Sequence, residues 1–423
     1  MATSAALCQS GGTLDEAVSP VWQWRSDNGE ALLNFNPANI ADSNHVIVLD
    51  SIPYAKNYTV VVVYKAIIDT EAIVWELNYG EGSRRGLTTE HIVSDGVSIR
   101  YTDATTGVPT VNSLRQSAPD SLSPYVSFTL GGGSLLGRTK VAEILYFDRW
   151  LDDVMLRRVQ SALAIRYGIT LGPVDYVDGK GERIWNHAAG GLFHHRVTGL
   201  GRDSTYNICQ TYSRSEMDYS MLTLSTDSLP EGGFLMCGDN DAPLLFETAG
   251  DIESLNRKWR VNSRGIENLY FTLAFDTRGI SGFQDSLVLI VDSAYYLPRI
   301  MSPEGVTYGD VVFPRDTSTF TLARGSVFWE MSKSKGRNAQ YEESRPVEST
   351  IYPNPTSGSY TIEVTGAAWV QVCIYSTQGV LMEHYSDRDR TRYVFDGNLP
   401  TGNSYYATVT TESGTQTIKL IVK

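Results

Sequence analysis

A proline-rich turn followed by a strict alternation of apolar and polar residues is the feature that most restricts the fold of this chain. The turn is Tyr352-Pro353-Asn354-Pro355. Its two prolines fix φ and remove backbone donors, so we expect one domain to end there and another to begin. Beyond it, apolar residues recur at every second position, as in strands that bury one face. These positions are Tyr360, Ile362, Val364, Val370, Val372, Ile374, Tyr405, Ala407, Val409, Ile418, Leu420 and Val422. The pattern predicts a small antiparallel sandwich, immunoglobulin-like, over residues 351–423.

This C-terminal segment also resembles a known family. The Tyr-Pro-Asn-Pro turn, the strand VQVCIYSTQGVLM, the turn LPTGNSYYATV and the ending TQTIKLIVK are similar to the C-terminal sorting domain of type IX secretion cargo in the Bacteroidetes. The resemblance implies a detachable signal that the outer-membrane translocon reads. It also implies that a cysteine-protease sortase commonly removes the signal while it joins the cargo to surface lipopolysaccharide. The positions matched to the family's sorting signal are Pro353, Asn354, Pro355, Gly358, Gly379, Leu399, Gly402, Tyr405, Lys419, Leu420, Val422 and Lys423. The alternative is an ordinary immunoglobulin-like module at the end of a secreted protein.

Length and composition indicate several β-rich domains. The 423 residues suffice for two or three domains, each with its own core. The 24 tyrosines, 8 tryptophans and 37 glycines favour strands and tight turns over helices. The formal net charge of -13 argues against nucleic acid as a partner, because phosphate binding needs clustered lysines and arginines.

The cysteines and the N-terminus bear on export. The four cysteines, Cys8, Cys209, Cys237 and Cys373, show no spacing typical of a zinc site. A disulfide between Cys209 and Cys237 is one hypothesis for an oxidising compartment, and small buried apolar residues are the alternative. Residues 1–13 have only a stub of the apolar core of a secretory signal. We therefore interpret them as a truncated leader or a disordered segment, with the true start of the precursor upstream.

Residues 14–172 are predicted to form a sandwich of jelly-roll type that one helix closes. Short apolar runs separated by polar turns predict strands at 45–49, 58–64, 73–79, 97–101, 125–130 and 141–147. The helical spacing of Met155, Val159 and Leu163 then predicts a helix. We expect Asp152 to cap its start and Gly168 its end.

The end of this domain is similar to a second family. The segment VAEILYFDRWLDDVMLRRVQSALAIRYGITL resembles the closing strand and helix of concanavalin A-like (laminin G-like) domains in Bacteroidetes surface proteins. The resemblance implies binding of glycans or proteins, sometimes through calcium, and some relatives are glycanases. A glycanase needs two carboxylates close together on one strand face, and the sequence shows no such motif. Trp22 and Trp24 share a strand face and could stack on sugar rings, although core packing is the more frequent role of such residues.

A second β-rich module is predicted at residues 173–337. The motifs Ile184-Trp185-Asn186, Val197 to Asp203, Phe234 to Asp241 and Trp259-Arg260-Val261 occur in the order of an uncharacterised module that often follows the concanavalin A-like domain in these surface proteins. The Gly-Asp-Asn-Asp loop makes Asp239 and Asp241 weak candidates for a calcium site, but an ordinary Asx turn uses the same residues and is the interpretation we favour. No other cofactor is expected. Residues 338–350 are polar and without periodicity, which predicts an exposed linker where the tail is cut off.

The sequence thus predicts an all-β, secreted protein that crosses the periplasm by type IX export and reaches the cell surface and outer membrane. Because no GxSxG, HExxH or Walker motif is present, we expect a binding or adhesion role toward a glycan or protein, not an enzyme. Two alternatives remain open. One is a surface hydrolase with acids on distant strands, and the other is a structural subunit of the secretion apparatus or of a surface layer.

Overall fold

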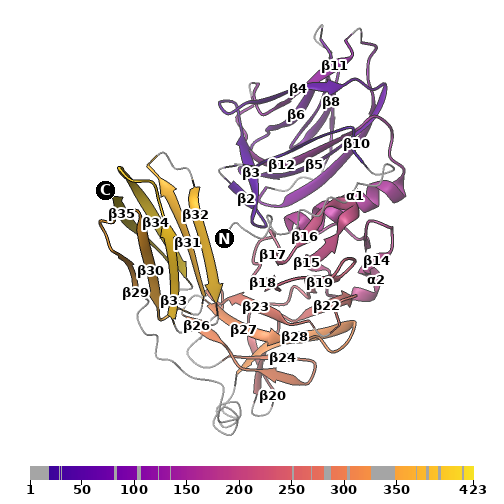
Figure 1. Ribbon diagram of the computed structural model, residues 1–423. Coiled ribbons are helices and arrows are strands. Elements are labelled where there is room, and N and C mark those ends of the chain that lie inside the picture. Colours follow the sequence, from indigo (N-terminus) through magenta and orange to yellow (C-terminus); the bar gives the residue numbers. More distant parts are fainter. Residues whose placement is uncertain are drawn as a thin grey trace. The chain divides into compact units, whose positions relative to one another are not determined.

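The computed structural model describes most of the chain. The described residues are 19–27, 29, 31–80, 83–101, 106–121, 123–133, 135–249, 252–267, 269–280, 287–302, 305–324, 348–367, 369–377, 381–388, 392–411 and 414–423. The chain divides into two compact units, residues 1–336 and 337–423 (Figure 1). The predicted leader at 1–13, with Cys8, and most of the predicted linker lie outside the described residues. The described parts are built almost wholly of strands, which confirms the prediction of an all-β protein of sandwich architecture.

The first sandwich consists of two antiparallel sheets. One has the strand order β10 (Pro109–Ser117), β5 (Asn57–Ala66), β12 (Thr139–Phe147), β3 (Asn36–Ala41) and β2 (Ala31–Leu33), and β1 (Trp22–Arg25) pairs with β12. The other has the order β4 (Ile47–Pro53), β11 (Tyr125–Leu130), β6 (Ile73–Asn78), β7 (Arg84–Thr88), β8 (His91–Ser94) and β9 (Val97–Arg100). Large side chains such as Tyr58, Trp75, Phe128 and Tyr146 fill the space between the two sheets. The predicted strand ranges located six of these strands in advance, namely β4, β5, β6, β9, β11 and β12, and had no counterpart for β2, β3, β7, β8 and β10.

The predicted closing helix is α1 (Asp153–Tyr167). The side chain of Asp152 accepts a hydrogen bond from the backbone N–H of Met155, and Gly168 ends the helix with φ of 61° in the left-handed region. Both predicted caps are therefore confirmed. The buried face of α1 belongs to a core that includes Val61 of the first sandwich and Trp185 of the following module. The helix thus joins two β modules in one compact unit.

The second module also consists of two packed sheets. The larger has the order β16 (Ile208–Gln210), β15 (His195–Asp203), β19 (Phe234–Asp239), β22 (Trp259–Arg264), β28 (Thr317–Arg324), β21 (Ile252–Leu255) and β20 (Phe246–Ala249). In addition, β24 (Val288–Val291) pairs with β28, and β25 (Ala294–Tyr296) pairs with β24. The smaller has the order β17 (Tyr212–Arg214), β18 (Leu222–Ser225), β23 (Phe271–Asp276), β27 (Gly305–Val311) and β26 (Ile300–Ser302). Three short elements precede them, namely β13 (Tyr176–Val177), β14 (Arg183–Trp185) and α2 (His187–Gly190), and the 3-10 turn η1 (Ser204–Tyr206) connects β15 to β16.

The turn between β2 and β3 locks the two modules together. Asn34 is fully buried there with φ of 46°, a backbone conformation that asparagine tolerates better than most residues. Its side-chain amide donates to the carbonyl of Arg166 (3.0 Å) and to Oγ of Ser213 (2.9 Å). Its Oδ1 accepts from the N–H of Arg214 at 2.8 Å, and its own N–H donates to Glu216 at 2.8 Å. Four groups from the end of α1 and the region of β17 therefore hold one asparagine.

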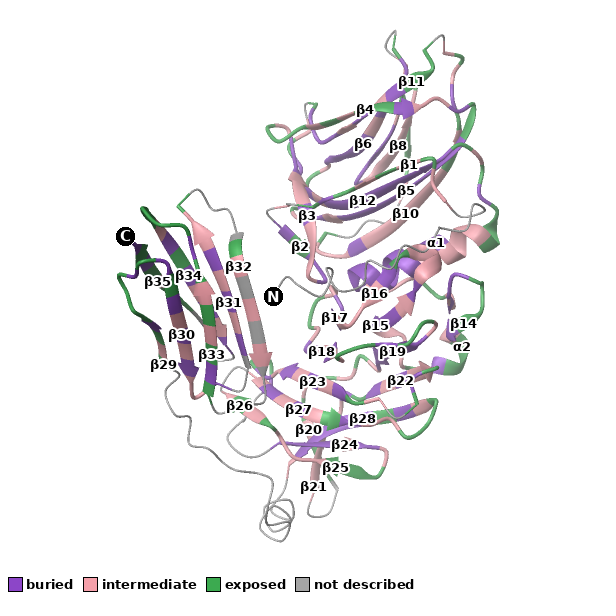
Figure 2. Ribbon diagram, viewed as in Figure 1, coloured by how far each residue is buried: buried purple, intermediate pink, exposed green. Residues whose placement is uncertain are grey.

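The C-terminal unit contains the predicted small sandwich, but its start was predicted too late. Strand β29 (Glu348–Tyr352) pairs with β30, so residues 348–350 of the predicted linker are strand and the proline-rich turn lies inside this domain. One sheet has the order β29 (Glu348–Tyr352), β30 (Ser359–Thr365) and β33 (Arg392–Asn398). The other has the order β32 (Leu381–Arg388), β31 (Trp369–Ser376), β34 (Asn403–Thr411) and β35 (Gly414–Val422). The apolar positions of the period-two pattern form its core, with Ile418 packed at the margin. Figure 2 shows the resulting alternation of buried and more exposed positions along these strands.

The disulfide hypothesis is wrong. Cys209 is disulfide-bonded, but Cys237 is a free, buried thiol. Cys209 lies on β16 and Cys237 on β19, and β15 lies between these two strands in the sheet. Strands two places apart are separated by about 9.5 Å, whereas a disulfide requires Cα atoms closer than about 7 Å. The spacing of the two cysteines in the sequence gives no sign that β15 lies between their strands.

Among the described helices, none has the length and apolar character needed to cross a membrane.

Candidate functional site in the C-terminal sandwich

The proline-rich turn lies along the outer edge of the last strand, β35. The side-chain amide of Asn354 donates to the carbonyl of Lys419 at 2.7 Å, and its Oδ1 accepts from the backbone N–H of Ile421 at 3.0 Å. An asparagine side chain carries one donor and one acceptor group, as a peptide unit does. Asn354 therefore replaces a neighbouring strand at this point of the edge.

Thr356 continues this edge pairing with its backbone. Its N–H donates to the carbonyl of Ile421 at 2.9 Å, and its carbonyl accepts from the N–H of Lys423 at 2.8 Å. The result is a short parallel bridge between Thr356 and Val422. The hydroxyl of the buried Thr356 also accepts from the N–H of Gly358 at 3.2 Å, which shapes the end of the turn. No local sequence pattern points to Thr356, because its partners Ile421 and Lys423 lie far along the chain.

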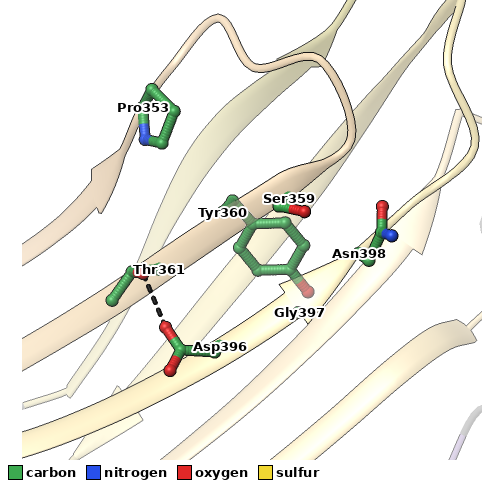
Figure 3. A pocket seen from close by; sticks show the side chains of 7 residues that line it. All are labelled: Pro353, Ser359, Tyr360, Thr361, Asp396, Gly397 and Asn398. Atoms are coloured by element: carbon green, nitrogen blue, oxygen red, sulfur yellow. Dashed lines mark hydrogen bonds between the residues drawn. The ribbon is translucent and has the colours of Figure 1, made fainter.

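A groove of about 510 Å³ opens where β29 ends (Figure 3). It exists because β29 pairs with β30 only as far as Tyr352 and Thr361, while β30 and β33 continue to pair as far as Ser359 and Asn398. Its lining consists of Pro353, Ser359, Tyr360, Thr361, Asp396, Gly397 and Asn398. The hydroxyl of Thr361 donates to the carboxylate of Asp396 at 2.6 Å across the floor.

Two tyrosine hydroxyls meet one carboxylate between the sheets beside this groove. Tyr360 on β30 and Tyr385 on β32 both donate to Oε2 of Glu383, so this cluster connects the two sheets. Burial and the hydrogen bond to Glu383 raise the pKa of Tyr360 far above its ordinary value, which keeps its hydroxyl protonated as a donor. Gly397 leaves the space for this cluster, because a Cβ at that position would overlap the Tyr360 hydroxyl and the Glu383 carboxylate.

The remaining sorting positions fall into three groups. Leu399, Tyr405, Leu420 and Val422 are buried in the sandwich core. Gly402 makes a turn at φ of 82°, which glycine adopts without strain. Lys419 and Lys423 are exposed, as are Pro353, Asn354 and Pro355 of the turn. Gly379 lies outside the described residues.

The tryptophans predicted as ligand contacts lie on one face of β1, as expected. Both are partly buried and pack against the core of the first sandwich. The ring of Trp22 stacks on Phe128, with 5.5 Å between the ring centroids. Trp22 and Trp24 therefore contribute to the interior of the sandwich.

The predicted calcium candidates are held by arginines. The carboxylate of Asp239 is buried and receives hydrogen bonds from Arg196 at 2.7 and 3.0 Å. Asp241 also bonds to Arg196, and its carboxylate lies 3.7 Å from the guanidinium of Arg257. The hydrogen bond from Arg196 lowers the pKa of Asp241. A dication would have to displace these guanidinium groups.

Another group of possible metal ligands lies where the β7–β8 hairpin contacts the segment before β6. Ligand atoms of Glu71, Glu90 and His91 lie within 4.8 Å of one another. Nδ1 of His91 is 2.7 Å from the carboxylate of Glu71, which also accepts from the hydroxyl of Thr88. The guanidinium of Arg100 lies 3.8 Å from Glu90. These contacts account for the cluster as a local network of hydrogen bonds and ion pairs.

Two families match parts of the chain. Residues 350–423 match the secretion system C-terminal sorting domain, and residues 155–307 match a domain of unknown function (DUF8202). The first match covers the turn, the groove and the free end of β35. The protein is therefore cargo of the type IX secretion system and is delivered to the cell surface. The second match begins inside α1 and brings no activity with it.

Likeness to solved structures is remote. A β-glucuronidase of Bacteroides uniformis has a TM-score of 0.14 at 8% identity, over 37% of this chain and 27% of its own. The BSP domain of a biofilm-associated protein has a TM-score of 0.15 at 8% identity, over 94% and 84%. The 47-kilodalton lipoprotein Tp47 of Treponema pallidum has a TM-score of 0.18 at 10% identity, over 88% and 91%. The chain spans about a quarter of the length of the β-glucuronidase, and similarities this low support no argument about function. No curated protein matches the chain.

Proposed function

We propose that this surface protein is an adhesin: residues 19–324 bind a glycan or another protein outside the cell, without catalysis. The C-terminal sandwich then serves delivery and takes no part in binding. The sorting-domain match supports the delivery part of this proposal. The binding part concerns residues 19–324, which are called the body from here on.

The direction of the carboxyl pKa shifts argues against one kind of catalysis, glycoside hydrolysis. A glycoside hydrolase keeps one carboxyl group protonated near neutral pH, which requires a raised pKa. In the described part of the body, every carboxyl group with a shifted pKa has it lowered. Glu143 is the clearest case. Burial alone would raise its pKa, but Arg166 and Arg25 outweigh burial and keep the carboxylate ionised.

Exposed apolar side chains on the first sandwich support a binding role. Val48 and Tyr125 are 57% exposed, and Val97 and Ile99 are 61% exposed. Val97 and Ile99 are alternate residues of the edge strand β9, so they share one face, whereas Val48 on β4 and Tyr125 on β11 lie at the opposite side of this sheet. Exposed aromatic and aliphatic side chains are common contact residues at protein surfaces that bind partners.

The later steps of surface attachment also belong to the proposal. We expect the sortase to cut the predicted linker 338–350 and to join the body to lipopolysaccharide. Residues 325–347 lie outside the described part of the chain, so this expectation comes from the sorting-domain resemblance.

A binding screen with a parallel turnover assay tests the function. The mature protein, released from the cell surface, is applied to a glycan array and is also incubated with the polysaccharides that bind. We expect saturable binding with no new reducing ends. Release of shorter glycans would show that the protein is a hydrolase and would contradict the adhesin proposal. Copurification with outer-membrane secretion complexes, with the tail retained, would instead favour the structural-subunit alternative.

A further inference from the structure

The outer edge of β35 is only partly covered. In an antiparallel ladder, alternate residues direct both backbone groups to the same side of a strand. Ile421 directs its N–H and C=O to Asn354 and Thr356, away from its partner strand β34. The other odd-numbered residues of β35, including Thr417 and Lys419, therefore also direct their backbone groups to this outer edge.

A count of these groups locates the uncovered part. Asn354 and Thr356 take the carbonyl of Lys419, both groups of Ile421 and the N–H of Lys423. Within the described residues, no hydrogen bond involves the N–H of Lys419 or the N–H and C=O of Thr417. Both residues are exposed to solvent. A short row of unpaired donors and acceptors thus remains on this edge.

We propose that this open edge, residues 415–419, receives an extended strand from a protein of the export machinery, which pairs with the backbone of Thr417 and Lys419. The inference rests on the sorting role of the module and adds how the module is recognised. Alternating N–H and C=O groups at the spacing of a strand are complementary to another extended polypeptide, as in β-augmentation.

The proline-rich turn fixes where such a strand has to stop. Pro353 and Pro355 lack an N–H, and Asn354 and Thr356 already occupy the edge beyond Lys419. An incoming strand therefore has one register, which ends at Lys419. The exposed side chains of Lys419 and Lys423 favour a partner strand with acidic residues.

Thr417→Pro is the sharpest test, with Thr417→Ala as its matched control. Proline at 417 removes an N–H that β34 does not use, so the sandwich retains its own ladder. Alanine removes the same side chain but keeps the N–H. We expect Thr417→Ala to reach the surface like the native chain. Thr417→Pro should lower the fraction of the protein that reaches the cell surface by about tenfold. Loss of one or two hydrogen bonds to the partner strand weakens its binding constant by about this factor.

Three readouts separate the outcomes. If purified Thr417→Pro has the native melting temperature but is exported as well as Thr417→Ala, the edge inference is overturned. If its melting temperature falls, the pair Lys419→Pro and Lys419→Ala is compared in the same way, because the N–H of Lys419 is also unpaired among the described residues.

A chain that lacks residues 351–423 is assayed alongside. If that chain also reaches the surface, the sorting role fails; if it stays in the periplasm while the proline variants are exported, only the edge inference fails.

Discussion

The carboxylate of Glu143 lies 2.9 Å from the guanidinium of Arg166, and both side chains are buried. Glu143 belongs to β12 of the first sandwich and Arg166 to helix α1. The same carboxylate accepts hydrogen bonds from Arg25 and from the hydroxyl of Tyr167, both at 2.9 Å. Arg166 also donates to the carbonyl of Tyr206 at 2.8 Å, which lies in the second module. The buried ion pair of Glu143 and Arg166 thus connects the first sandwich with helix α1 and the second module.

Replacing Glu143 by Gln should destabilise the body strongly. The change leaves Arg166 buried without a counter-charge, which typically costs about 3–5 kcal/mol. The measurement is the denaturant midpoint of the full chain. Glu90→Gln is the control, because its nearest guanidinium is 3.8 Å away and such exposed pairs contribute about 0–1 kcal/mol. Equal midpoints for the two variants would contradict the role of Glu143.

The melting temperature of the body should fall as the pH is lowered into the acid range. A group whose folded-state pKa is lowered stabilises the fold above its unfolded pKa, and this stabilisation is lost as the pH falls through the folded pKa. Arginines lower the pKa of the buried Glu143, and hydrogen bonds from Asn44 and His45 lower that of Asp42 to about 2. We therefore expect a flat melting temperature down to about pH 5 and a fall below about pH 4. The fall should be shallower in Glu143→Gln; identical pH profiles would count against this assignment.

Asn354→Asp should loosen the end of the sorting domain. The carboxylate cannot donate to the carbonyl of Lys419, so one hydrogen bond is lost and two acceptors face each other. We expect a loss of about 1–2 kcal/mol, seen as faster hydrogen exchange at the N–H of Ile421. Asn403→Asp is the control, since among the described residues that exposed amide donates only to the carbonyl of Thr401, at 3.2 Å. Unchanged exchange at Ile421 would show that Asn354 does not hold the strand.

Gly397→Ala should disturb the groove more than Gly402→Ala does. At Gly397 the new methyl group would overlap the hydroxyl of Tyr360 and the carboxylate of Glu383, and such overpacking costs about 1–3 kcal/mol. At Gly402 no other atom lies within 4 Å of the added methyl group, so only the strain of the positive φ remains, which costs about 1 kcal/mol. Thermal unfolding of the two variants decides between these expectations, and a larger loss at Gly402 would refute the packing argument.

Calcium should leave the melting temperature of the protein unchanged. Arg196 already binds the carboxylates of Asp239 and Asp241, so a dication would have to break these ion pairs. The check is thermal unfolding in millimolar calcium and in chelator. A rise in melting temperature with calcium that Asp241→Asn abolishes would restore the calcium-site hypothesis.

Features with local causes could be predicted from the sequence. The strand at 125–130 and the helix between Asp152 and Gly168 follow from side-chain period and from caps that act within a few residues. The sandwich of the C-terminal unit follows from the same alternation, which fixes the buried face of each strand.

Contacts between distant residues could not be predicted. Asn354 bonds to Lys419, 65 positions away, and Asn34 bonds to Arg166, 132 positions away. The pairing of Asp239 with Arg196 likewise depends on two neighbouring strands, so the sequence showed only two acidic residues in a loop. The prediction of a disulfide between Cys209 and Cys237 failed for the same reason. Only the order of strands in the sheet shows that β15 lies between the two strands that carry these cysteines.

The central claim is that the C-terminal sandwich is the export signal of this protein. The most direct measurement compares the full chain with a chain ending at residue 350, by the fraction of each that external protease can reach on intact cells. The account predicts that the full chain is digested and that the shortened chain stays protected in the periplasm with its body folded. Equal digestion of both would contradict it.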